Sequence, residues 1–297
     1  AAQDPPPAPA DPLGTFAEET RVAWVLVPVG VAEDGRWLTD LDRGDFRLAV
    51  DGRPVDFPDF EGGEAPVSLI VLQDLSGSMA NGGKLEASRA ALEVLIDQAG
   101  PGDELALASF AGGELAVEVP FTRDESVVAE AMRLWQGYGT TALHDAVAWI
   151  PEIAVEGRHP RRAVVLVTDG VDNASRLSPD AARAVVRGAR LPVFVLGLGR
   201  EGLAQTAGDL AGGGEQTYGA LLQRLARATG GRYLPLSRPA EAQAAAEDLL
   251  DELRHQYILA FPISPEPAEE RLLEVSVKSD GATVYHRRAY FGGPPIG

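Results

Sequence analysis

The strongest fold signal in this chain is the stretch Val67-Ser-Leu-Ile-Val-Leu-Gln-Asp-Leu-Ser-Gly-Ser-Met79. Its first part, Val67–Leu72, is rich in β-branched residues and leucine, and it lacks the polar alternation of a half-exposed strand. Such a run predicts a strand that is buried on both faces. The run ends in a loop that carries an acid and two hydroxyls at alternating positions, Asp74, Ser76 and Ser78.

A second buried run, Ala163–Thr168, ends in the same way, with Asp169 directly after it. In an open parallel α/β sheet, ligands bind beyond the carboxyl ends of the strands, where the strand order reverses. If the two strands are neighbours, Asp169 meets the acid and the two hydroxyls of the first loop. Such an all-oxygen set suits hard cations such as Mg²⁺, Ca²⁺ or Mn²⁺ rather than zinc.

These pieces resemble the metal-ion-dependent adhesion site of von Willebrand factor A (VWA) domains, whose signature is Asp-x-Ser-x-Ser followed by a distant Thr and a distant Asp. The signature is matched by Asp74-Leu75-Ser76-Gly77-Ser78, and the distant Asp by Asp169. The family's Gly-Gly-Thr-x-Leu-x-Asp-Ala segment is similar to residues 139–146. We align the family threonine with Thr141 and keep Thr140 as the alternative.

The resemblance covers roughly residues 65–254, and it implies a divalent ion, Mg²⁺ or alternatively Ca²⁺ or Mn²⁺. Ser76 and Ser78 would coordinate it directly, Thr141 directly or through water, and the two aspartates mostly through water. The implied function is metal-dependent protein binding in adhesion or assembly, in which the ion captures a Glu or Asp carboxylate of a protein partner, without catalysis. The implied metal-site residues are Asp74, Ser76, Ser78, Thr141 and Asp169.

Three alternatives compete with this function. A metal-dependent phosphotransferase could use Asp74 as its nucleophile, but such enzymes typically carry a second acid two residues later, where this chain has Ser76. A serine hydrolase needs a histidine base, and His144, one helical turn after Thr141, is the nearest candidate, although we expect it to lie at the rim or partly buried. Nucleotide hydrolysis is disfavoured because no Gly-x-x-x-x-Gly-Lys-Ser/Thr loop occurs. Thirdly, the ion could be purely structural and join two loops.

The composition of the chain narrows the range of possible binding partners. The 297 residues carry a net charge of −18, which argues against binding to nucleic acid or to an anionic membrane surface. No segment approaches the ~20 consecutive apolar residues of a membrane span. The absence of cysteine excludes disulfides and thiolate metal sites. Residues 1–14, which are rich in Pro and Ala and lack an initiator Met, predict a poorly ordered leader. This start fits signal-peptide cleavage, and hence an exported (periplasmic or secreted) protein, about as well as it fits an artificial chain start.

Strands and helices alternate between residues 65 and 254, which predicts an α/β fold with a doubly wound, mostly parallel, Rossmann-like sheet. Glu114–Val119 should pair antiparallel with Glu104–Phe110. Thr122 should open a helix with a capping box, and a helix starting at Thr141 should be kinked or ended by Pro151. The remaining predicted elements are helices Lys84–Ala99, Ser178–Ala189, Leu221–Thr229 and Ala240–Arg254, strand Pro192–Leu198 and a loop Gly202–Gly219.

Both ends of the chain are strand-like. We expect residues 15–64 and 255–297 to form one smaller β-sandwich, with the VWA domain, residues 65–254, inserted into it. A similar layout, with an Asp-Phe-x-x-x-x-Asp-Gly segment like residues 45–52, is typical of bacterial "VWFA-related domain" proteins. The alternative is a loose N-terminal strand and a C-terminal hairpin packed on the VWA domain. The predicted strands are Arg21–Val29, Phe46–Val50, Val55–Phe60, Gln256–Phe261, Leu272–Lys278 and Thr283–Phe291.

Four apolar or aromatic positions complete the expectations. Trp135 and Trp149 should lie in the core, because each sits on the apolar face of a predicted helix. Tyr138, directly before the threonine loop, should lie at the rim of the site, and Leu75 should face away from the metal ligands.

Overall fold

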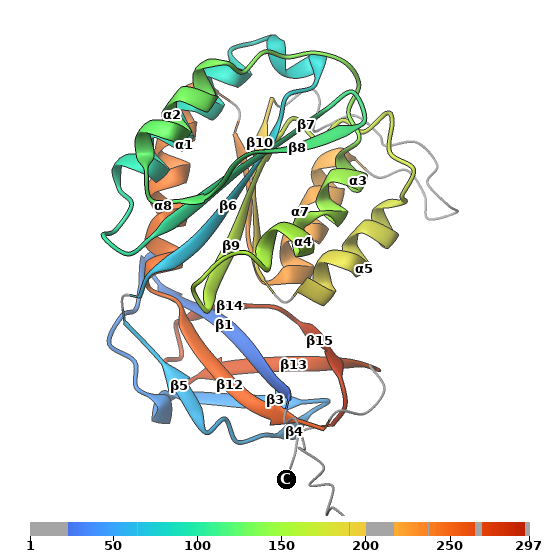
Figure 1. Cartoon of the computed structure of the whole chain (residues 1–297). Coiled ribbons are helices and arrows are strands. Elements are labelled where there is room, and N and C mark those ends of the chain that lie inside the picture. The colour runs from blue at the N-terminus through green and yellow to red at the C-terminus, as the bar shows by residue number, and fades with distance from the viewer. Residues whose placement is uncertain are drawn as a thin grey trace, which may run out of the picture.

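The structure is a computed structural model that describes residues 23–63, 65–189, 191–199, 217–236, 238–264 and 269–294. The predicted leader, 1–14, and most of the loop predicted at Gly202–Gly219 lie outside these residues. Figure 1 shows a helix-covered sheet joined to a smaller unit made of strands. Within the described residues, no helix is both long enough and apolar enough to cross a bilayer.

The larger unit is built on a six-stranded sheet in the order β11-β10-β9-β6-β7-β8. All neighbouring strands in it run parallel except β7 and β8, which are antiparallel. The predicted mostly parallel sheet and the adjacency of its two central strands are therefore confirmed. The strands are β6 (Val67–Asp74), β7 (Glu104–Ala111), β8 (Glu114–Thr122), β9 (Arg161–Thr168), β10 (Val193–Leu198) and β11 (Tyr233–Leu236).

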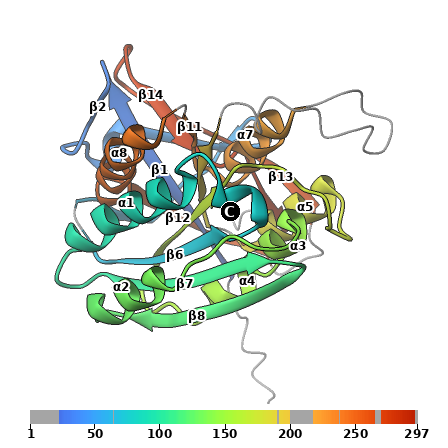
Figure 2. The same ribbon diagram turned by 90° about the horizontal axis from the view of Figure 1, so that it is seen from above.

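Helices cover both faces of this sheet (Figures 1 and 2). Strand β6 supplies both cores, because Leu69 and Val71 pack on one side while Ile70 and Leu72 pack on the other. This double burial explains why the strand has no polar face. One face carries α1 (Lys84–Asp97), α2 (Glu125–Arg133) and α8 (Ala242–Arg254), and the other carries α3 (Leu143–Ala148), α4 (Ile150–Ala154), α5 (Pro179–Ala189) and α7 (Tyr218–Thr229).

Two predicted helix starts are wrong. Helix α2 begins at Glu125 and is capped by Asp124, whose carboxylate accepts a hydrogen bond from the backbone N–H of Ser126 (3.1 Å). Thr122 does not cap it because this residue still belongs to β8. Helix α3 starts after Ala142 without a side-chain cap, so Thr141 is not used as a cap.

Pro151 acts as predicted, because it lies in the first turn of α4, just after α3 has ended. The two tryptophans differ. Trp135 is buried, whereas Trp149 is half-exposed. The prediction for Trp149 fails because its side chain lines a surface cavity, together with Val117 and Phe121 of the outer strand β8, and does not enter the core.

The smaller unit joins the two ends of the chain. Strand β1 (Ala23–Glu33) pairs antiparallel with β12 (Tyr257–Ile263) from Ala23↔Ile263 to Val29↔Tyr257. One sheet has the order β14-β1-β12-β5 with β2 beside β1, and the second has the order β15-β13-β3-β4. The α/β unit is thus inserted into a sandwich built from both ends, as predicted. The other strands are β2 (Arg36–Trp37), β3 (Phe46–Val50), β4 (Arg53–Pro54), β5 (Asp59–Glu61), β13 (Glu269–Val277), β14 (Thr283–His286) and β15 (Ala289–Gly292).

Two predicted strands of the sandwich differ from those observed. The predicted strand Thr283–Phe291 is two strands, β14 and β15, in different sheets. The chain crosses between the sheets at Arg287, whose buried guanidinium donates to the carbonyl of Leu26 (2.7 Å). The strand predicted at Val55–Phe60 is reduced to β5. The domain boundaries 15–64, 65–254 and 255–297 stay predictions.

A buried ion pair lies where the two units meet. Arg232, just before β11, bonds to the carboxylates of Glu252 and Asp248 (2.6 Å to Asp248). Its guanidinium carbon lies 5.3 Å from the ring centre of Trp37 and 5.7 Å from that of Tyr285, both in the sandwich. Glu252 is fully buried, and this burial raises the pKa of its carboxyl to about 7 despite the attraction of Arg232.

This pKa predicts a dependence of stability on pH. The folded chain holds the Glu252 proton with a pKa of about 7, against 4.5 for an ordinary glutamate. Ionisation therefore lowers the free energy of unfolding as the pH rises from about 4.5 to about 7, by roughly 2–3 kcal/mol. Glu252→Gln cannot ionise and should gain stability relative to the native chain across this window. Urea unfolding at several pH values measures it, with the exposed Glu247→Gln as control; parallel curves for the native chain and Glu252→Gln would contradict the prediction.

Candidate metal-binding site

Three loops meet at the carboxyl edge of the central sheet, the end from which Figure 2 is viewed. They follow β6, precede α3 and follow β9. The first is joined to the second by a hydrogen bond from the N–H of Gly77 to the carbonyl of Gly139 (3.1 Å). The second is joined to the third because the carbonyl of Thr141 accepts the N–H groups of Asn173 and Ala174 (both 3.0 Å). The backbone thus fixes the three loops relative to one another.

Glycine is required where the first two loops touch. A Cβ on Gly137 would lie 2.8 Å from the backbone nitrogen of Ala80, which is closer than real Cβ contacts come. A Cβ on Gly77 would lie 3.2 Å from the carbonyl oxygen of Gly139. The small residues around the Asp-x-Ser-x-Ser signature therefore permit the close approach of backbones that brings the hydroxyl groups together.

Asp74 is fully buried at the end of β6. One carboxylate oxygen accepts the N–H of Ser76 (2.8 Å), and the other accepts the hydroxyl of Thr168 (2.6 Å). Burial raises the pKa of Asp74 to about 6, and the nearby charge of Asp169 adds to this rise, while the hydrogen bonds oppose it. Thr168 was not predicted as part of the site, although its position at the end of β9, directly before Asp169, could have indicated this role.

The hydroxyl groups of the two signature serines lie together and are mostly shielded from solvent. The Oγ atoms of Ser76 and Ser78 are 3.1 Å apart, Ser76 being buried and Ser78 half-buried. Thr141 is only 2% exposed, whereas Thr140 is exposed. The backbone N–H of Thr141 donates to the side chain of Asn173 (2.9 Å). Burial therefore favours Thr141 over Thr140 as the threonine of the site, and its role as a ligand stays a prediction.

Asp169 carries a partner that the sequence analysis missed. Its Oδ2 accepts a hydrogen bond from the ammonium group of Lys84 (2.6 Å), which also donates to the carbonyl of Ser78 (3.1 Å). The Asp169 side chain is 1% exposed, so the pair is almost entirely shielded on the carboxylate side. The available signal was the position of Lys84, the first helical residue after the signature loop.

The donor set fits a hard divalent cation. It combines two buried carboxylates with three hydroxyls, and all of these are oxygen ligands of the kind that Mg²⁺ prefers. A buried carboxyl group whose pKa is raised by desolvation is stabilised when a cation is bound beside it. The described residues contain no group of three or more His, Cys, Asp or Glu side chains arranged to hold a metal. The fit therefore depends on the hydroxyl groups.

His144 does not serve the two signature serines as a base. Its Nδ1 lies 3.2 Å from Oδ2 of Asp172, to which the hydroxyl of Ser175 also donates (2.5 Å). Burial lowers the pKa of His144, against the attraction of Asp172. Ser76 and Ser78 are hydrogen-bonded to each other instead. His144 is largely buried near the site, as expected for a partly buried histidine.

The predictions for Tyr138 and Leu75 agree with the exposure of these two side chains. Tyr138 is 56% exposed, and its backbone N–H donates to the carbonyl of Leu75 (2.9 Å). Leu75 is 5% exposed and packs in the core under α1. Leu75 therefore faces the hydrophobic core.

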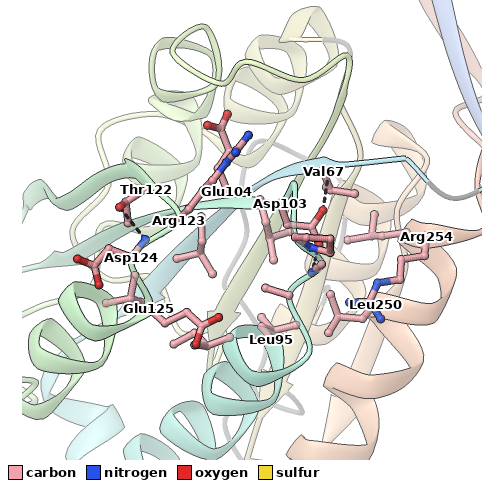
Figure 3. A pocket seen from close by; sticks show the side chains of 18 residues that line it. Val67, Leu95, Asp103, Glu104, Thr122, Arg123, Asp124, Glu125, Leu250 and Arg254 are labelled. Atoms are coloured by element: carbon pink, nitrogen blue, oxygen red, sulfur yellow. Dashed lines mark hydrogen bonds between the residues drawn. The ribbon is translucent and has the colours of Figure 1, made fainter.

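A cavity of about 180 Å³ lies at the opposite end of the sheet, between the end of α1, the start of α2 and the end of α8 (Figure 3). Leu95 and Leu250 contribute apolar walls. The carboxylate of Asp103 accepts the N–H groups of Val67 (2.9 Å) and Gly100 (2.7 Å), so it is used to close the turn between α1 and β7. This cavity is separate from the metal-site loops because it lies at the first residue of β6, whereas Asp74 is the last.

The comparisons agree with this architecture. The model of the von Willebrand factor type A domain family matches residues 69–171. The chain carries a VWA domain. A von Willebrand factor type A protein from Catenulispora acidiphila has a similar structure, with 14% identity, a TM-score of 0.53, and coverage of 92% of this chain and 75% of that chain.

Proximal thread matrix protein 1 from the mussel byssus is a second similar structure, in a form with a zinc-occupied MIDAS motif. It has 16% identity and a TM-score of 0.50, and the match covers 64% of this chain and 48% of that chain. At these identities both matches establish the fold. The search of curated protein sequences gives no match.

The bond between Thr168 and Asp74 is testable. Thr168→Val keeps the shape but removes a hydroxyl that donates to Asp74 and accepts the N–H of Gly170 (3.0 Å). Two buried polar groups lose their partner, so the free energy of unfolding should fall by about 1–3 kcal/mol. Thr283→Val, at an exposed position in β14, is the control and should change stability little. Denaturant unfolding without metal measures both; equal stabilities would show that the Thr168 bond does not hold the site.

Proposed function

We propose that this VWA domain is a metal-dependent protein-binding module for adhesion or assembly. In this proposal a divalent ion, Mg²⁺ or alternatively Ca²⁺ or Mn²⁺, is held by Asp74, Ser76, Ser78, Thr141 and Asp169, and it captures an Asp or Glu carboxylate of a protein partner. The observation that carries the proposal is the convergence of buried carboxylates and hydroxyls on three loops that are hydrogen-bonded to one another. VWA domains bind protein partners, often in adhesion or assembly, which supports it.

The chemistry of the donors explains why a bound ion would act on a partner. Mg²⁺ prefers ~six oxygen ligands, and when bound it supplies an electrophilic centre for an outside oxygen. Neutral hydroxyls neutralise less of its charge than carboxylates do. Asp74 is held by the backbone of Ser76 and the hydroxyl of Thr168. These bonds orient the Asp74 carboxylate at the end of β6.

The charge of the chain makes a local attraction necessary. A net charge of −18 repels a carboxylate at long range, but salt screens this repulsion beyond about 8 Å. An ion at the carboxyl edge acts within that distance. The same charge disfavours nucleic acid as a partner.

The proposal assigns no catalytic role to the site. Neither Ser76 nor Ser78 is bonded to a histidine within the described residues, so a serine nucleophile lacks its base. A purely structural ion, the remaining alternative, predicts neither turnover nor metal-dependent binding of a partner. The zinc-occupied MIDAS motif of the mussel byssus protein, which has a similar fold, supports the proposal of a divalent cation. Export to the periplasm or the medium stays a prediction.

The metal site is tested by the two adjacent threonines. A divalent ion that binds only the folded state raises the melting temperature by mass action. We expect Mg²⁺ or Mn²⁺ at millimolar concentration to raise the melting temperature of the native chain, Thr141→Val to abolish most of this rise, and Thr140→Val, at the exposed neighbour, to retain it. Scanning calorimetry with and without EDTA measures the rise. An equal rise in all three proteins would place the ion elsewhere.

Partner capture is tested with exported proteins of the source organism. A protein partner with an exposed Asp or Glu should bind to the immobilised chain in Mg²⁺ and be released by chelator. Ser78→Ala should lose this binding while keeping its circular dichroism spectrum, and the surface variant Glu93→Gln should not lose it. If the purified chain instead hydrolyses phosphate or acyl esters, and Ser76→Ala removes that activity, the binding proposal is wrong.

A further inference from the structure

Lys84 brings a fixed positive charge into the proposed metal site. It is the first residue of α1, and its Nζ donates to Asp169 (2.6 Å) and to the carbonyl of Ser78 (3.1 Å). Its side chain is 19% exposed. The ammonium group therefore contacts both the distant aspartate of the site and the loop that carries the signature serines.

The route of the Lys84 side chain is also built into the fold. Gly199, directly after β10, adopts φ +84°, and a Cβ on it would lie 2.9 Å from Cε of Lys84. The lysine side chain thus passes close to Gly199, and the absence of a side chain on this glycine leaves room for it. Gly83, with φ +71°, is the N-cap of α1, so it turns the chain into the helix that presents Lys84. The ammonium group is thus held between the loop after β6 and the loop after β9.

We propose that Lys84 sets the net charge of the metal site so that the loaded site requires an outside carboxylate. This inference rests on the proposed function. The ionised carboxylates of Asp74 and Asp169 carry two negative charges, and Lys84 reduces the total to one. A divalent ion then gives a site with one net positive charge, which a single partner carboxylate neutralises. Without Lys84 the loaded site is already neutral, and a partner carboxylate makes it negative.

The charge of Lys84 affects metal binding and partner binding in opposite directions. The ammonium group repels a divalent cation at the same carboxylates, so it weakens metal binding. It attracts an arriving carboxylate, so it strengthens partner binding. Both effects are large near a buried site, because the interaction of charges a few ångströms apart grows as the effective dielectric constant falls. Lys84 therefore lowers the affinity of the site for the metal ion and raises the affinity of the loaded site for a carboxylate.

The test compares Lys84→Met, which keeps a long apolar side chain against Gly199 and removes the charge, with Lys84→Arg, which keeps the charge. Calorimetric titration gives the affinity for Mn²⁺, and water-proton relaxation of the Mn²⁺-loaded protein gives the affinity for acetate. For Lys84→Met we expect Mn²⁺ to bind about tenfold or more tightly and acetate about tenfold or more weakly than in the native chain. Lys84→Arg should remain near the native chain in both. Lys84→Gln serves as a second uncharged variant if Lys84→Met does not fold.

The outcomes separate this inference from the function on which it rests. If the uncharged variants bind both Mn²⁺ and acetate more weakly, Lys84 only maintains the shape of the loops and the inference is overturned. It is also overturned if both affinities stay unchanged, while the proposed function stands. If the native chain binds no Mn²⁺, or Thr141→Val binds it equally well, the proposed function fails and the inference with it.

Discussion

The hydrogen bond from the Thr168 hydroxyl to the Asp74 carboxylate joins the ends of the two central strands at a place that water does not reach. Strands β6 and β9 pair in parallel up to Gln73↔Val167, so the next residues of each strand arrive at the same level. Both strands are buried on both faces and pack into the two helix-covered cores. The loops after β6 and β9 therefore begin at the same level, and the geometry of the site depends on this strand pairing.

The buried carboxylates of this molecule are compensated in different ways. Glu252 pairs with Arg232 between the two units, and Asp169 pairs with Lys84. The hydrogen bonds described for Asp74 come from a neutral backbone N–H and a neutral hydroxyl. Neutral donors orient a carboxylate but do not cancel its charge, and removing an ion from water is costly unless a counter-charge is present. The raised pKa of Asp74 expresses this deficit, and a divalent cation beside it would remove the deficit.

The sequence predicted the features that depend on periodicity and on motif order. The unbroken apolar runs of β6 and β9 predicted adjacent buried strands, and the strand-like ends predicted the sandwich. Features that depend on three-dimensional proximity were missed. Asn173 bonds to Thr141, and Lys84 bonds to Asp169, across distances in sequence that no local pattern encodes, although the position of Lys84 directly after the signature loop was an available signal. Local signals also failed where the tertiary structure uses the residue otherwise: Thr122 remains in a strand, and the helix predicted to start at Thr141 begins at Leu143.

The most direct test of the account is the location of the bound ion. Crystals grown with Mn²⁺ and measured near its absorption edge would give an anomalous difference map. The account predicts a strong peak beside the hydroxyl oxygens of Ser76, Ser78 and Thr141, with an oxygen of water, of a buffer carboxylate or of a neighbouring acidic side chain completing its ligands. A map without a peak there, at a Mn²⁺ concentration that raises the melting temperature, would contradict it.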